Sequence, residues 1–139
     1  MKQQPRDWQC GAHRAHFEEP DTLVAEFNGL ITLEEVKETV TLYQQTATDH
    51  GQYYLIADIG RSQLEAAGRR YMSEKASSDW YHAILYVGAD IVMQTFVKAI
   101  ALALLFTGKS TFETVFVKTQ DEARAWVAQH RLRLKSKAG

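Results

Sequence analysis

The chain has 139 residues, of which 45% are apolar and 24% charged, and its formal net charge is −1 at pH 7. These values indicate one globular domain with a sizeable core, and the near-neutral charge argues against nucleic acid as a partner. A lone cysteine, Cys10, cannot form an internal disulfide. The first residues lack the apolar stretch of a signal peptide, and the longest apolar run, residues 91–106, is too short to span a membrane. We therefore expect a cytoplasmic protein with no membrane span.

The first part of the chain predicts a loose segment and then a β-hairpin. Residues 1–13 are polar and mixed, and we expect them to form a flexible N-terminal segment. Pro20 and Asp21 are a turn pair between two runs of strand-like residues. The sequence thus predicts two antiparallel strands that meet at this turn.

A helix is predicted over residues 31–51, with a signal at each end. Thr32 and Glu35 have the spacing of a capping box, in which the hydroxyl accepts a backbone N–H and the carboxylate reaches back to the start of the helix. Gly51 has the position of a residue that ends the helix. Apolar residues between these signals recur every three or four positions, which indicates one buried face.

Strands and helices alternate over the rest of the chain. Residues 53–59, 82–88 and 113–119 are short, mainly apolar runs, and the first two have the pattern of strands covered on both faces. Helices are predicted between and after them, over about 62–78, 90–107 and 120–132. Because alternation requires crossover connections, we expect an α/β domain with a mostly parallel sheet.

Two motifs resemble a phosphate-binding loop and a metal site, and each lacks a feature that such a site needs. Residues 107–110, TGKS, resemble the end of a phosphate-binding loop, but Ala103 stands where that loop needs glycine and the segment follows a helix instead of a strand. Cys10, His13 and His16 are three residues apart, which in a strand places them on alternate faces. No other catalytic constellation is visible, so we expect no metal, no cofactor and no enzymatic activity.

The most unusual predicted element is the apolar helix at residues 91–106. Its first half is amphipathic and its second half is apolar on all sides, so the helix needs cover. Three interpretations remain open: a core helix against the sheet, a subunit interface, or the wall of an apolar ligand site. The candidate residues are Met93, Phe96, Val97, Ile100, Leu104 and Leu105.

Ser62 lies where the helix at 62–78 is predicted to begin. With Glu65 it has the spacing of another capping box, and Arg69 and Arg70 have acidic residues four positions away, as on a solvated helix face. A helix N-terminus also stabilises a phosphate, so Ser62 is a candidate phosphate acceptor with both arginines nearby. The capping role alone is the favoured interpretation.

Four stretches in this order and spacing carry a resemblance to a known family: FNGLITLEE, LIADIG, AILYVGAD and FVKTQDEARAWV. Over residues 14–131 the chain resembles the SpoIIAA-like fold shared by STAS domains and small SEC14-like proteins. The resemblance implies an N-terminal β-hairpin followed by βα units, in a mixed, mostly parallel sheet flanked by four helices. A single STAS-like domain would then occupy residues 14–132, with a basic tail at 133–139.

The resemblance also implies a function. Similarity to anti-sigma-factor antagonists implies a regulatory protein-interaction module without catalysis, in which Ser62 would inherit the phosphorylated position. The sequence departs from that pattern, because Ile-Gly-Arg-Ser follows Asp58 with no second serine. We expect a homodimer with partner contacts near the helix at 62–78 and the apolar helix at 91–106. The alternative is a SEC14-like binder of an apolar, lipid-like molecule, with residues 91–106 as the cavity wall.

Overall fold

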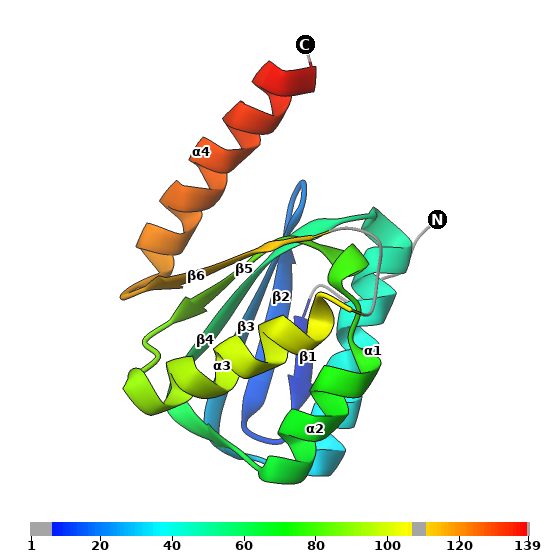
Figure 1. Cartoon of the computed structure of the whole chain (residues 1–139), viewed down its shortest axis with the longest axis vertical. Helices are drawn as coiled ribbons and strands as arrows, with labels where there is room; N and C mark the ends of the chain where they lie inside the picture. The colour runs from blue at the N-terminus through cyan, green and yellow to red at the C-terminus, as the bar shows by residue number, and fades with distance from the viewer. Residues whose placement is uncertain (1–6, 107–110, 139) are drawn as a thin grey trace.

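A six-stranded sheet runs through the centre of the molecule in the computed structural model, which describes residues 7–106 and 111–138 (Figure 1). The strands lie in chain order, and the first three are antiparallel while the remaining pairs are parallel. They are β1 (Asp7–Cys10), β2 (His13–Glu18), β3 (Thr22–Ile31), β4 (Tyr53–Leu64), β5 (Tyr81–Val87) and β6 (Glu113–Val117).

Helices cover both faces of the sheet. Three of them, α1, α2 and α3, lie on one face, and α4 lies on the other and projects past the sheet at its C-terminal end (Figure 1). Their bounds are α1 (Leu33–His50), α2 (Ala66–Lys75), α3 (Ile91–Leu104) and α4 (Gln120–Ala138), with a short 3₁₀ turn η1 (Ser78–Trp80) before β5. The predicted α/β architecture is confirmed: an N-terminal hairpin is followed by βα units in a mixed, mostly parallel sheet flanked by helices.

Local signals at α1 act as predicted. The Thr32 side chain accepts a hydrogen bond from the Glu35 N–H, and the Glu35 carboxylate accepts one from the Thr32 N–H at 3.1 Å, which completes the capping box. Gly51 ends the helix with a φ of 77°, a conformation that favours glycine. The hairpin predicted at Pro20 and Asp21 is the β2–β3 pair.

The start of the second helix differs from the prediction. Ser62 does not cap α2, because β4 continues through it to Leu64. After an irregularity in register, residues 28–31 of β3 pair with residues 61–64 of β4, so backbone hydrogen bonding claims this segment before a helix can begin. Glu65 occupies the N-cap of α2 without a side-chain cap, and its carboxylate instead accepts the Leu33 N–H at 2.9 Å, which ties α2 to the start of α1.

Both ends of the chain are more regular than predicted. Residues 7–10, expected to be loose, form β1 and pair with β2. The basic segment after residue 132, expected to be a tail, continues α4 to Ala138. The rejected TGKS motif at 107–110 lies outside the described residues.

Polar contacts fix α4 on its face of the sheet. Among the residues of this helix whose burial is described, 120–136, only Ala123 and Val127 are buried in the apolar cluster there. Arg124 makes two hydrogen bonds to Glu18, at 3.1 and 2.8 Å, and lowers the pKa of that carboxyl to about 2. Arg131 makes a similar pair of bonds to Asp21. The two arginines therefore hold α4 against the β2–β3 hairpin at Glu18 and at Asp21.

Gly68 allows α1 and α2 to pack closely. A Cβ atom at this position would lie 2.8 Å from Val36 Cγ2, well inside normal contact. We expect Gly68→Ala to lower the free energy of unfolding by about 1 kcal/mol net, since overpacking costs roughly 1–3 kcal/mol and helix propensity returns roughly 0.5–1 kcal/mol. Chemical denaturation measures this. With Val36→Ala in the background the same change should be stabilising, and a stabilising effect in the wild-type background would contradict the packing account.

Candidate binding site

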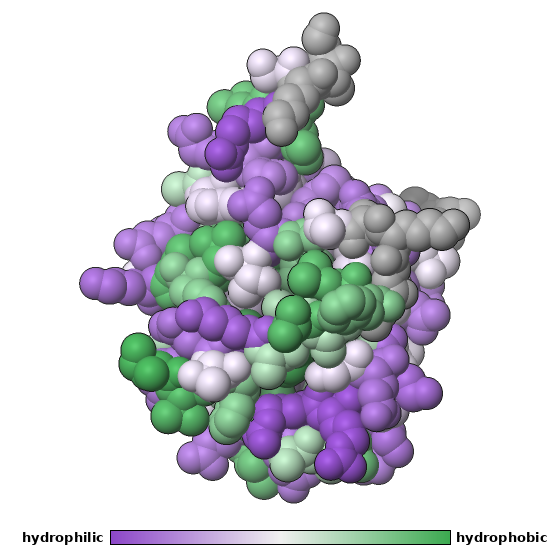
Figure 2. All heavy atoms as spheres, in the orientation of Figure 1, coloured by the Kyte–Doolittle hydropathy of each residue, from purple (hydrophilic) through white to green (hydrophobic). Residues whose placement is uncertain are grey.

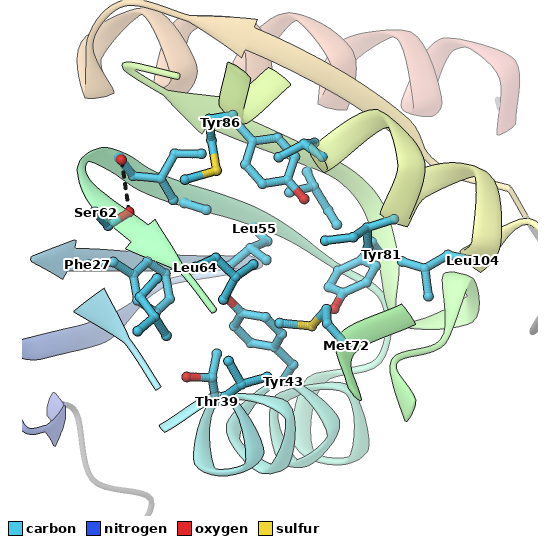
Figure 3. Close-up of a pocket in the computed structure, with 18 residues that line it drawn as sticks. Phe27, Thr39, Tyr43, Leu55, Ser62, Leu64, Met72, Tyr81, Tyr86 and Leu104 are labelled. Carbon is cyan, nitrogen blue, oxygen red and sulfur yellow. Dashed lines mark hydrogen bonds between the residues drawn. The ribbon is translucent and has the colours of Figure 1, made fainter. Parts of the chain in front are cut away.

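An apolar cavity of about 70 Å³ lies between the sheet and helices α1–α3 (Figure 3). Its walls come from strands β3, β4 and β5 and from all three helices, because the side chains of each element that face this layer meet here. Apolar residues dominate the lining, among them Phe27, Leu55, Met72, Met93, Val97 and Leu104.

Hydroxyl groups interrupt this apolar lining. The Thr39 hydroxyl donates to the Glu35 carbonyl at 2.8 Å, and the Ser62 hydroxyl donates to the Ile59 carbonyl at 2.9 Å (Figure 3). Both polar groups are therefore satisfied by the backbone of their own element. The other hydroxyls belong to tyrosines of α1 and β5.

Buried tyrosines form a layer at the side of the cavity. The Tyr53 hydroxyl donates to the Tyr43 carbonyl at 2.9 Å and is also hydrogen bonded to Tyr81. Burial raises the pKa of Tyr43, Tyr81 and Tyr86 well above the ordinary value near 10. These phenols are therefore neutral hydrogen-bonding groups at any physiological pH.

A cleft of about 430 Å³ lies next to the cavity at the carboxyl ends of β4 and β5. Ser62, Leu64 and Met93 line both the cavity and the cleft. At the floor, Gly60 and Gly88 bring the two strand ends together, and a Cβ at Gly88 would lie 3.0 Å from the Gly60 Cα. Carboxyl ends of parallel strands are where α/β folds commonly bind their ligands.

The predicted group of Ser62, Arg69 and Arg70 is only partly assembled. The Arg69 guanidinium lies 4.0 Å from the centre of the Phe96 ring and donates to the Leu64 carbonyl at 3.0 Å, so it links α2 to α3 at the cleft. Ser62 and Phe96 line this cleft, whereas Arg70 is an exposed residue of α2.

One side of helix α3 packs in the core, and the other side exposes apolar residues. Val97, Ile100 and Leu104 are buried, and Met93 and Phe96 are partly buried. By contrast Leu105 is 45% exposed. Further exposed apolar residues at its two ends are Ile91, Val92, Leu102 and Phe106. Figure 2 shows apolar side chains gathered over both ends of the helix.

The C-terminal end of this exposed side forms a patch with a groove. We define the α3 patch as Leu102, Leu105 and Phe106, which are 59%, 45% and 84% exposed. A groove of about 280 Å³ between α3 and β6 adjoins it and is lined by Lys98, Ala101, Leu102, Leu105, Phe112 and Thr114. Large exposed apolar surfaces of this kind mark sites of association.

Histidine and cysteine at the start of the chain have structural contacts. His13 is buried, accepts the Asn28 N–H at Nδ1 and lies 2.9 Å from the Glu35 carboxylate through Nε2, which fixes Nε2 as the protonated nitrogen of the neutral ring. Burial raises the pKa of Cys10 to about 11. Over residues 7–106 and 111–138 no three His, Cys, Asp or Glu residues are grouped to hold a metal ion.

Comparison with known proteins agrees with this geometry. A family model described as SpoIIAA-like matches residues 22–128. The chain belongs to the SpoIIAA-like family. Comparison with curated proteins gave no match. Within the described part of the chain, no helix combines the length and the apolarity needed to cross a bilayer.

Two solved structures share the fold. The anti-sigma factor antagonist SpoIIAA in its unphosphorylated form has a TM-score of 0.56 and 10% identity, covering 84% of this chain and 98% of that one. An uncharacterized DUF3478-family protein from Shewanella loihica also has a TM-score of 0.56, with 18% identity over 83% of this chain and 91% of that one. At these identities the likeness shows the fold.

Sequence reasoning missed the tyrosine layer. Apolar periodicity predicts a buried face for the first helix, but nothing in the sequence indicates that Tyr43 on this face meets Tyr81 and Tyr86 from a strand about forty residues away. Tyr81 and Ile84 are three positions apart, which in a regular strand places them on opposite faces. Both face the cavity because the register is irregular at the start of β5. That irregularity is visible only in the structure.

The raised pKa values make the tyrosine layer sensitive to alkali. Because the folded state favours the neutral phenols, their contribution to stability is complete below pH ~10 and is lost as the pH rises above it. We expect tyrosinate absorbance from Tyr43, Tyr81 and Tyr86 to develop together with the loss of circular dichroism in an alkaline titration. The urea-unfolded chain, as control, should ionise near pH ~10. Reversible ionisation of all tyrosines near that pH, with the dichroism unchanged, would contradict the burial.

Proposed function

We propose that the protein is a non-enzymatic protein-interaction module that forms a homodimer through the α3 patch. The observation that carries this proposal is the exposure of Leu102, Leu105 and Phe106 next to an apolar groove on the same helix. A protruding side chain beside a groove is self-complementary, because a two-fold axis places the side chain of each copy in the groove of the other.

The energetics favour association at this patch. Fully burying a Leu or Phe side chain stabilises by roughly 1.5–3 kcal/mol, and a two-fold interface buries each residue twice. Lys98 and Thr114 at the edge of the groove provide the polar rim that interfaces of this kind have. Only part of the gain appears as affinity, since association also costs rotational and translational freedom.

A regulatory role agrees with the fold and with the chemistry of the cleft. The solved structure of SpoIIAA is that of an anti-sigma factor antagonist, and this chain shares its fold. In the cleft, the Ser62 hydroxyl is bonded to a backbone carbonyl and no described His, Asp or Glu side chain contacts it as a base. A serine held in this way is a poor nucleophile, which supports binding over catalysis.

The dimer proposal predicts the effect of a charge in the α3 patch. Leu102→Glu should raise the dimer dissociation constant at least about a hundredfold, since each of two buried carboxylates replaces a buried leucine. Sedimentation equilibrium over a range of concentrations measures this. Leu132→Glu is the matched control, because Leu132 is 62% exposed on α4. A wild-type monomer at every concentration, or an equal effect of Leu132→Glu, would refute the proposal.

Phosphorylation of Ser62 stays a prediction, with a changed physical basis. A phosphate on Ser62 would replace the bond to the Ile59 carbonyl and place about two negative charges among Leu64, Met93 and Phe96. Such a group would give the cleft surface a negative charge instead of completing a helix cap. Arg69, at the Phe96 ring, is the nearest of the two predicted arginines to this cleft.

Two variants separate a switch from a structural serine. Ser62→Ala should lower the free energy of unfolding by about 1 kcal/mol for the lost hydrogen bond and leave partner binding intact. Ser62→Asp should remove partner binding while the far-ultraviolet dichroism stays that of the folded chain. Affinity for the partner protein, once purified, and chemical denaturation are the measurements. Equal partner affinity of the two variants excludes the switch.

The cavity favours a second candidate function, a binder of an apolar, lipid-like molecule. Its lining is apolar with few polar groups, as ligand sites commonly are. The volume of about 70 Å³ is small beside the roughly 300–1,000 Å³ of typical ligand pockets. A long acyl chain would therefore need α2 and α3 to move apart and break the Arg69–Phe96 contact. A small ligand fits without this change.

A further inference from the structure

Two tyrosine hydroxyls in the cavity lack an acceptor. Tyr53 and Tyr81 use their hydroxyls within the tyrosine layer, as described above. Tyr43 from α1 and Tyr86 from β5 also line the cavity, and Figure 3 shows both side chains directed into the space between the sheet and the helices. Neither of these two hydroxyls donates a hydrogen bond to an acceptor of the described residues, and burial is the largest cause of both raised pKa values.

These two hydroxyls border the empty space. In the described residues that are not exposed, every side-chain nitrogen or oxygen atom without solvent-accessible surface has a hydrogen-bond partner. Tyr43 and Tyr86 line the cavity, and their unpaired hydroxyls therefore retain some accessible surface, although Tyr43 is only 4% exposed. An unpaired buried donor is costly, and the cost disappears if an occupant of the cavity supplies the acceptor.

The lining also selects the charge and size of an occupant. None of the residues that line the cavity carries a charge, so an ionised carboxylate or ammonium group would be buried without a counter-ion. The volume accommodates on the order of five water-sized groups at 10–15 Å³ each. Ser62, Leu64 and Met93 line both this space and the open cleft, so the two spaces are neighbours.

We propose that the cavity is a binding site for a small, neutral molecule with an apolar body and one acceptor oxygen, such as a ketone, held by hydrogen bonds from Tyr43 and Tyr86. The proposal rests on the second candidate function and gives it a ligand class: small, uncharged and oxygen-bearing. The apolar lining contacts the body of the molecule, and the two phenols select the oxygen.

Matched probes test this with the full chain. Cyclohexanone labelled with ¹³C at the carbonyl and methylenecyclohexane have the same shape, and only the ketone has an acceptor. We expect cyclohexanone to bind about tenfold more tightly by saturation-transfer NMR, and the carbonyl resonance of the bound ketone to lie downfield of its position in a hydrocarbon solvent. Hexanoate, of similar size and ionised, should not bind.

Variants assign the selectivity to the two phenols. Tyr43→Phe with Tyr86→Phe should bring cyclohexanone down to the affinity of methylenecyclohexane and leave the hydrocarbon unchanged. Tyr54→Phe, on the opposite face where that hydroxyl contacts His130 at 2.8 Å, is the matched control and should keep the preference. Dichroism confirms the fold, and each single Tyr→Phe variant should show part of the loss if the double variant unfolds.

The outcomes distinguish this inference from the second candidate function on which it rests. Equal binding of the ketone and the hydrocarbon to the wild-type chain would overturn the role of the phenols and keep an apolar ligand site. Absence of binding by either probe would overturn both, because the cavity would then hold water. Retention of the preference by the double variant would also overturn the proposal.

Discussion

Strand β4 has to be covered on both faces, and the rest of the molecule is arranged to do this. Residues 53–57 are consecutive and each is at most 3% exposed. Alternate side chains face opposite layers, so Tyr53 and Leu55 pack under α1–α3 while Tyr54 and Ile56 pack under α4. Five buried residues in succession leave no face for water, which is why the strand lies in the interior of the sheet.

The two covers differ in chemistry, and the candidate site follows from that difference. α4 contributes two buried residues, and arginine–carboxylate pairs at the β2–β3 hairpin fix its position. The other cover is three helices packed through apolar side chains, and three helices over a twisted sheet do not fill all the space between them. The remaining space is the cavity, and helix α3, at the margin of this layer, has an apolar side left without cover.

Much of the fold follows from local sequence, and each of two errors can be traced to a strand pairing. The capping box at Thr32 and Glu35 is confirmed because its two partners are three residues apart and need nothing else. The same spacing at Ser62 and Glu65 gave a wrong helix start, because β3 extends far enough to pair with residues 61–64. A pairing partner about thirty residues away is invisible in a local pattern. The strand at residues 7–10 was missed for a different reason: its partner is close by, since Cys10 pairs with His13, and the tight turn between them was not recognised.

The candidate site was predictable only in part. Apolar periodicity correctly indicates that α3 has a core side, since Val97, Ile100 and Leu104 are buried. It does not indicate how far neighbouring elements reach around the helix, and so it left core, interface and ligand wall as open alternatives. Tyr43 and Tyr86 share a cavity through tertiary packing, for which neither residue carries a sequence signal.

The close approach of Gly60 and Gly88 gives the cleft a bare floor. At this point the ends of β4 and β5 contact each other through their backbones, with no side chain between them. A molecule that enters the cleft therefore contacts backbone atoms at its base. Substitutions cannot change the chemistry of these backbone groups. Selectivity for one ligand over another must therefore come from side chains at the rim of the cleft, such as Ser62 and Phe96. These residues can change in evolution without disturbing the contact between the two glycines.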